Sequence, residues 1–239
     1  MTETMPPRAD LPFDPEGSML TEEVQTRPTV SDELGNEALD ILRRSRGPAS
    51  DEVVATALEY LASKPVGYNV RPAADDEGDT GFVFALGGIG IATVNVYTNE
   101  SSTADVGMLT VNEQLRRHGL ATRLMHAAVS LMKDRGITNL DSGNLSRDAL
   151  LTRIAVFGEE NLSFYFTKAH RLAGRQGPPP ATVGEALELL NSIEAARSPE
   201  DNSPMYTFGV HTDLTKVDTD HWERPVPVKI DATRVIYEE

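Results

Sequence analysis

Hydrophobic positions follow a helical period in the first part of this 239-residue chain. Between residues 31 and 65 the apolar residues recur every three or four positions, which predicts two amphipathic helices. We expect the first to run from a cap at Ser31 to about Arg46, and the second from a cap at Ser50 to Pro65. The predicted buried stripes are Leu34, Ala38, Ile41 and Leu42 in the first helix and Val53, Val54, Ala57, Leu58 and Leu61 in the second.

The pattern then changes to that of strands. Residues 66–70, 82–86, 89–97 and 105–111 are rich in β-branched and aromatic side chains and are separated by polar or glycine-containing segments. Gly87 and Gly88 fit a two-residue hairpin turn, in which both central residues have positive φ. The last three of these segments predict an antiparallel meander, and residues 66–70 are expected to form a short strand before it.

A helical period returns after residue 119 and continues to Gly136, a residue suited to the end of a helix. A short strand over residues 137–140 follows at once. A strand, a helix and a returning strand predict a parallel crossover, so segments 105–111 and 137–140 should be parallel neighbours. The fold class that follows is α/β (α+β), with a mixed, mostly antiparallel sheet.

The last hundred residues are less regular. A helix over residues 148–157 begins at a cap, Ser146, while residues 162–167 do not decide between strand and helix. Thr182 caps a last helix to about Arg197, and segments 205–210 and 226–237 are expected to be closing strands. The chain thus divides into a flexible tail (1–28), a core (29–174) and a C-terminal helix with closing strands (175–239), part of the same domain or an extension.

Composition excludes several classes of function. The net charge of −15 argues against broad nucleic-acid binding, which needs a basic face. The chain has no cysteine, so disulfides, thiolate metal ligands and a cysteine nucleophile are excluded. Its histidines have no metal-ligand spacing, and no metal site is expected. Neither a secretory leader nor a membrane span is evident, so we expect a cytoplasmic protein without membrane contact.

Three basic residues stand where a helix should start, in the sequence VNEQLRRHGLATRLM (111–125). Cations there are unfavourable by roughly 0.3–1 kcal/mol each, because the helix dipole is positive at this end. The N–H groups near Gly119 would form an anion-binding nest that a phosphate could occupy. For Arg116 and Arg117 the plainer alternative is solvated surface charge, and His118 either touches phosphate or has no role.

The same residues resemble the signature of the GNAT superfamily of acyl-CoA-dependent N-acyltransferases. That signature is a strand ending in Leu-x-Val, a short turn, and then (Arg/Gln)-x-x-Gly-x-(Gly/Ala) at the start of a long helix. The chain has Leu109-Thr110-Val111, four residues, and Arg116-Arg117-His118-Gly119-Leu120-Ala121. The order of predicted elements from residue 31 to residue 140 also matches the family.

The resemblance implies a GNAT-like twisted sheet with helices on both faces and a direct acyl transfer from acetyl-CoA, as co-substrate, to a primary amine. Segments 105–111 and 137–140 would splay apart at one end and leave a cleft for the acyl group. The backbone of the strand end would pair with pantetheine, and the amides of residues 117–122 would hold the pyrophosphate. A homodimer is a further expectation, and the acceptor is not determined by the sequence. The implied cofactor-binding residues are Leu109, Thr110, Val111, Arg116, Arg117, His118, Gly119, Leu120, Ala121, Thr122 and Asn144.

The catalytic residues are less well defined, because the family's later Asn, helix, Tyr and Gly-Phe pattern is incomplete here. Tyr165 is the candidate general acid, although a tyrosine between two phenylalanines is also typical of a core position. Glu113 and Glu100 are weak candidates for the base, and both could equally be turn charges. The alternative function is therefore a GNAT-like fold that serves as a non-catalytic interaction or structural module.

Overall fold

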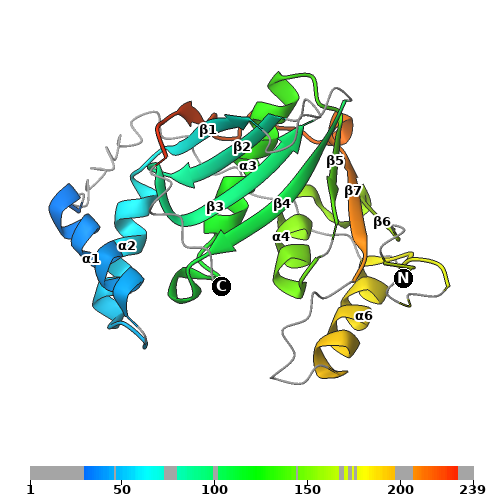
Figure 1. Ribbon diagram of the computed structural model, residues 1–239, viewed down its shortest axis with the longest axis horizontal. Coiled ribbons are helices and arrows are strands. Elements are labelled where there is room, and N and C mark those ends of the chain that lie inside the picture. Colours follow the sequence, from blue (N-terminus) through cyan, green and yellow to red (C-terminus); the bar gives the residue numbers. More distant parts are fainter. Residues whose placement is uncertain are drawn as a thin grey trace, which may run out of the picture.

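A single mixed sheet organises the protein, as seen in a computed structural model that describes residues 30–45, 47–72, 80–98, 102–143, 145–166, 170–171, 174, 177–196 and 207–230. The predicted tail (1–28), Glu100 and Asn144 lie outside these residues. The strands are β1 Val66–Pro72, β2 Thr80–Leu86, β3 Ile89–Thr98, β4 Thr103–Val111, β5 Asn139–Ser142, β6 Leu162–Tyr165, β7 Gly209–Asp213 and β8 Val226–Pro227. Their order across the sheet is β6-β7-β5-β4-β3-β2-β1-β8 (Figure 1).

The helices follow the expected chain order. They are α1 Asp32–Arg44, α2 Asp51–Ala62, α3 Leu120–Asp134, α4 Arg147–Phe157 and α6 Val183–Ala196, with short 3-10 turns at Glu113–Leu115, Glu159–Asn161 and Leu214–Lys216. Serine side chains cap three of them, since Ser31, Ser50 and Ser146 each accept a hydrogen bond from the amide three residues later. These three caps were predicted from the sequence and are confirmed.

The predicted buried face of α1 is partly wrong. Leu34 and Ile41 are 56% and 41% exposed, whereas Gly35 and Leu39 are buried with the predicted Ala38 and Leu42. The reason is the close approach of α1 to α2, since a Cβ on Gly35 would overlap the ring of Tyr60. A glycine carries no hydrophobic signal, so the periodicity could not locate this contact.

The three-stranded meander is confirmed, with β2, β3 and β4 paired antiparallel in chain order, and β1 pairs antiparallel with β2. Gly87 and Gly88 have φ of 58° and 71°, as the predicted hairpin turn requires. Between β3 and β4 the register shifts, because Gly107 and Met108 on β4 stand opposite Asn95 alone on β3. This arrangement is a β-bulge, which bends the strand just before its signature end.

The parallel crossover is also confirmed. Asp105 on β4 pairs with Asp141 on β5, and the two strands have no register beyond that pair, so they splay apart. β5 starts two residues later than predicted because Ile137 completes the end of α3. Its amide donates to the carbonyl of Met132, and the Gly136 amide donates to that of Lys133, which is a Schellman motif.

The C-terminal segment inserts β7 next to the edge strand β6 and adds β8 at the opposite edge of the sheet. Residues 162–167, undecided in sequence, form the strand β6 up to Tyr165, and β7 lies between β6 and β5, antiparallel to both. The predicted strand 205–210 is displaced, because β7 begins only at Gly209. Of the predicted strand 226–237, the described part forms only the short β8, parallel to β1, and residues 231–239 lie outside the described chain.

Side-chain alternation separates two faces of the sheet near β4 and β5. Ala104, Val106 and Leu140 lie in the main core, which includes residues of α3, and α3 crosses behind the sheet in the view of Figure 1. Because neighbouring residues of a strand point to opposite faces, Asp105 and Asp141 point away from this core. A second core, under β6 and β7, contains Leu150 of α4 and Leu190 of α6.

Candidate active site

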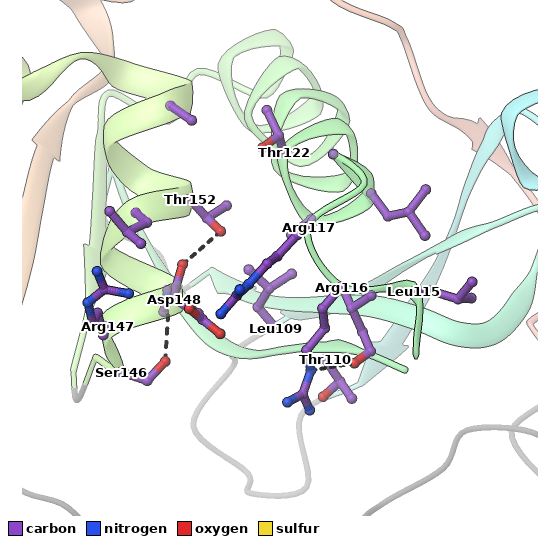
Figure 2. Close-up of a pocket in the computed structure, with 17 residues that line it drawn as sticks. Leu109, Thr110, Leu115, Arg116, Arg117, Thr122, Ser146, Arg147, Asp148 and Thr152 are labelled. Carbon is purple, nitrogen blue, oxygen red and sulfur yellow. Dashed lines mark hydrogen bonds between the residues drawn. The ribbon is translucent and has the colours of Figure 1, made fainter. Parts of the chain in front are cut away.

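A cleft of about 750 Å³ opens where β4 ends, α3 begins and α4 begins (Figure 2). The splay of β4 from β5 creates it, since the two strands no longer fill the space between them beyond Asp105 and Asp141. Its lining residues are Leu109, Thr110, Val111, Leu115, Arg116, Arg117, Gly119, Leu120, Ala121, Thr122, Ser146, Arg147, Asp148, Ala149, Leu151, Thr152 and Ala155.

The N-terminus of α3 is open toward this cleft. Its N-cap is Gly119, with φ of 77° and no side chain to accept from the first amides. The helix has no acidic residue in its first turn, in contrast to α1, α2 and α4, which each have a serine cap and an acid there. The unpaired N–H groups of a helix start and its dipole favour an anion, so this end can bind a phosphate group.

Arg117 has an unusual backbone conformation, with φ of 66°, the one positive value among the described residues other than glycine. The left-handed region costs such a residue of order 1 kcal/mol or more. Arg116 before it is extended, and its Nε donates to the Val111 carbonyl at 3.1 Å. Figure 2 shows the Arg117 side chain pointing across the cleft toward Asp148. The strained turn therefore directs a cation into the cleft.

The cleft is locally basic in an acidic chain. Three arginines line it against one aspartate, whereas the whole chain has a net charge of −15. Arg147 and the rest of the α4 wall were missed by the sequence reasoning. A signal was available, because Arg147 directly follows the cap Ser146 and thus repeats the pattern of a cation at a helix start.

Most of the predicted cofactor-binding residues line this cleft together. They are Leu109, Thr110, Val111, Arg116, Arg117, Gly119, Leu120, Ala121 and Thr122. His118 is exposed and is not among the lining residues, and Asn144 lies outside the described residues. Glu113 is exposed in the turn before α3 and does not line the cleft either.

Tyr165 is not among the residues that line this cleft and lies on β6, which β7 separates from β5. Its half-buried side chain crosses Gly209 of β7, and its hydroxyl donates to the carbonyl oxygen of Ser142 at 3.3 Å. Burial raises the pKa of Tyr165 to about 12, with contributions from the charges of Asp141 and Asp105 that Arg153 partly offsets. The hydroxyl therefore stays protonated across the neutral range and can act as a donor.

Arg153 of α4 is a buried cation beside the same residue. Its side chain is 3% exposed, and Nη2 donates to the hydroxyl of Ser142. Its Nη1 makes no hydrogen bond within the described part of the chain. Burial lowers the pKa of Arg153 to about 10, against the opposing effect of Tyr165 and Asp141. At the end of β5, Ser142 thus accepts hydrogen bonds from both residues: its carbonyl from the Tyr165 hydroxyl and its side chain from the Arg153 guanidinium.

The histidines take two different roles. His126 stacks on Trp222 with ring centroids 4.1 Å apart, and burial lowers its pKa, so it is a packing residue. His211 instead lies beside Asp141, with Nδ1 and Oδ1 2.6 Å apart. No sequence signal linked these two residues, because 70 positions separate them.

Among the described residues no group of three or more His, Cys, Asp or Glu side chains could hold a metal ion. No described helix is both long and apolar enough to cross a bilayer.

Comparison with known proteins agrees with the sequence motif. Residues 40–153, just under half of the chain, match the model of the acetyltransferase (GNAT) family. The match includes the signature strand, α3, β5 and most of α4, which confirms the resemblance drawn from residues 109–121. No curated protein sequence matches the chain.

Solved structures with a similar arrangement include three acetyltransferases. The Bacillus subtilis acetyltransferase in complex with CoA is 11% identical, with a TM-score of 0.38, over 62% of this chain and 98% of its own. The IAA acetyltransferase from Bacillus cereus is 14% identical, with a TM-score of 0.37, over 62% and 99%. The GNAT acetyltransferase from Staphylococcus aureus Mu50 is 10% identical, with a TM-score of 0.33, over 76% and 92%.

Proposed function

We propose that this protein transfers an acetyl group from acetyl-CoA directly to a primary amine. The observation that carries the proposal is the uncapped start of α3, which opens onto a basic cleft of about 750 Å³. Residues 29–174 would form the CoA-binding core, and residues 175–239 would complete its sheet.

The residues around the cleft fit CoA in two ways. The amides from Arg117 to Thr122, with the Arg116 and Arg117 side chains, would hold the pyrophosphate. The edge of β4 from Leu109 to Val111 has no β5 partner, so its backbone groups can pair with pantetheine as an added strand would. Acetyl-CoA, when bound, supplies an activated thioester.

The chain's own groups then have to orient an amine and protonate the leaving sulfur. No cysteine is present to form an acyl-enzyme, which favours direct attack by the amine. Tyr165 is our candidate acid, because its hydroxyl is protonated at neutral pH and lies at the end of β5, beside the opening.

The alternative, a non-catalytic module, would be favoured by a cleft filled with the chain's own side chains. The open volume beside α3 is the specific observation that favours the enzyme instead.

Calorimetry with acetyl-CoA tests whether the protein binds the proposed co-substrate. An assay of thiol release from acetyl-CoA, run with a panel of amines, tests whether it transfers the acetyl group. We expect saturable binding that weakens with salt, followed by amine-dependent thiol release. Absence of acetyl-CoA binding would contradict the proposal. Binding without release in any amine would favour the interaction module.

A further inference from the structure

A carboxylate–imidazole pair lies on the sheet face that points away from α3. Asp141 and His211 are directly opposite each other in the β5–β7 register, and Oδ1 lies 2.6 Å from Nδ1. Their side chains are 28% and 39% exposed, so both are held and both remain accessible. Because a carboxylate only accepts, Nδ1 carries the proton of this bond. In the neutral imidazole this leaves the lone pair on Nε2.

This pair lies at the point where the sheet opens. β4 and β5 pair as far as Asp105 and Asp141 and separate immediately afterwards. The cofactor cleft lies along the separated part of β4, and Leu140, the neighbour of Asp141, points into the core that includes residues of α3. A thioester held in the opening would therefore be reached from the opposite face beside Asp141.

The side chains of Tyr165 and His211 project from the same face of the sheet. His211 pairs with Ser163 across β6–β7, and Tyr165 pairs with Gly209 two residues away, so the two side chains are diagonal neighbours on one side of the sheet. The Tyr165 hydroxyl contacts the Ser142 carbonyl, next in sequence to Asp141. A candidate base and the candidate acid thus flank one end of β5.

We infer that His211 is the base that deprotonates the acceptor, with Asp141 as its positioning residue, and that the acceptor is an amine that arrives as an ammonium cation. This inference rests on the proposed function and names the substrate class of the same site. The groups that face the imidazole are Asp141 on β5, Tyr165 on β6 and, one strand further, Asp105 on β4. The buried Arg153 of α4 interacts electrostatically with Tyr165 and Asp141. Two carboxylates favour a cationic acceptor and disfavour one with a carboxylate near its amine.

The proton balance of the step is complete. Nε2 of His211 takes one proton from the ammonium, and the free amine forms the N–C bond with the thioester carbonyl. The C–S bond breaks, and the sulfur leaves with a proton from the Tyr165 hydroxyl, which regains one from the new amide nitrogen. The products are the acetamide, the CoA thiol and one proton released from His211 to solvent.

The kinetic test compares His211→Gln with the wild type, using the amine that reacts fastest among n-butylamine, tyramine and spermidine. We expect kcat/KM for the amine to fall at least 30-fold at pH 7. The difference in kcat/KM between the variant and the wild type should shrink as pH rises, because more of the amine is then already deprotonated. Acetyl-CoA affinity should be unchanged. His221→Gln, at an exposed histidine elsewhere, is the matched control and should keep wild-type kinetics.

A second variant separates catalysis from folding. Asp141→Asn keeps the size of the side chain but removes the charge that fixes the tautomer, and we expect about a tenfold loss with a changed pH profile. Wild-type kcat/KM and pH dependence in both variants would overturn the inference.

A readout without turnover distinguishes this inference from the proposed function. In NMR spectra of the wild type, the imidazole signals of His211 should shift when n-butylammonium chloride is added, and sodium chloride at equal ionic strength should not shift them. If acetyl-CoA binds and no amine is acetylated, the proposed function fails. Unchanged His211 signals with n-butylammonium would contradict the acceptor site itself.

Discussion

The ring of Tyr165 lies over Gly209, its partner in the β6–β7 register. A Cβ at position 209 would overlap the ring, so only glycine leaves room for it. The tyrosine hydroxyl can therefore cross β7 and reach the Ser142 carbonyl on β5, at 3.3 Å. Without this crossing the hydroxyl would stay on the far side of β7 from the splayed strands.

The first prediction concerns the hydroxyl of Tyr165. Tyr165→Phe keeps the ring and its packing, and we expect turnover to fall at least tenfold because the acid is lost, with acetyl-CoA affinity unchanged. Steady-state kinetics and calorimetry on one preparation measure both. Full turnover in the variant would make Tyr165 a packing residue only.

A companion variant tests the position of the ring. Gly209→Ala should displace it and lower turnover to a similar extent. The double variant Gly209→Ala/Tyr165→Phe should then be no slower than the slower single variant, because both changes remove one function. If the losses of turnover in the two single variants add up in the double variant, Gly209 affects turnover independently of Tyr165.

The second prediction concerns the start of α3. Gly119→Asp should abolish acetyl-CoA binding, since it adds a side chain and a negative charge where the phosphates are proposed to lie. Gly136→Asp is the matched control. Both glycines have positive φ and no atom within 4 Å of an added Cβ, but Gly136 lies at the opposite end of the helix. Calorimetry should give wild-type affinity for this control, and equal losses in both variants would indicate unfolding.

The third prediction concerns the strained arginine. Arg117→Gly relieves the left-handed backbone, so we expect the free energy of unfolding to stay level or rise by up to about 1 kcal/mol. Acetyl-CoA binding should weaken by about 1–2 kcal/mol, and less at high salt, because a charged contact is lost. Denaturant unfolding and calorimetry measure the two effects. A stabilised variant with unchanged affinity would exclude a role for this side chain in binding.

The fourth prediction concerns the pH dependence of stability at Glu223. Its carboxylate accepts from Arg123 of α3 at 2.7 Å and from the Val66 amide of β1 at 2.8 Å. Burial acts to raise the pKa of Glu223, but these hydrogen bonds and the charge of Arg123 outweigh it, and the pKa is lowered. A lowered pKa stabilises the fold above the unfolded value of 4.5, and this stabilisation disappears as pH falls through the folded value.

We therefore expect Glu223→Gln to lower the free energy of unfolding by about 1 kcal/mol at pH 7, since solvent screens this partly exposed carboxylate, and the difference should close as pH falls below 4.5 and through the folded value. Urea unfolding at several pH values measures it. Asp134→Asn serves as control, because it removes the exposed pair with Arg224, worth at most about 0.5 kcal/mol. A difference that does not change with pH would contradict the ionic role of Glu223.

The sequence by itself determined the features that depend on near neighbours. A serine cap and the amide it binds are three residues apart, and a hairpin turn needs only Gly87 and Gly88. The uncapped start of α3 is equally local, since Arg116, Arg117 and Gly119 stand together in one turn. Such interactions are fixed by backbone geometry within a few residues, which is why they could be predicted without a fold.

Only the tertiary structure decided where distant strands lie. The chain leaves β5 at Ser142 and returns almost seventy residues later as β7, and no local rule states that β7 inserts between β5 and β6. That insertion brings His211 to Asp141 and lets Tyr165 cross Gly209. In the same way, the close packing of Gly35 against Tyr60 buries a different face of α1 from the one that the periodicity predicted. Pairing across a sheet depends on the packing of the whole chain, so these contacts have no signature within a short sequence window.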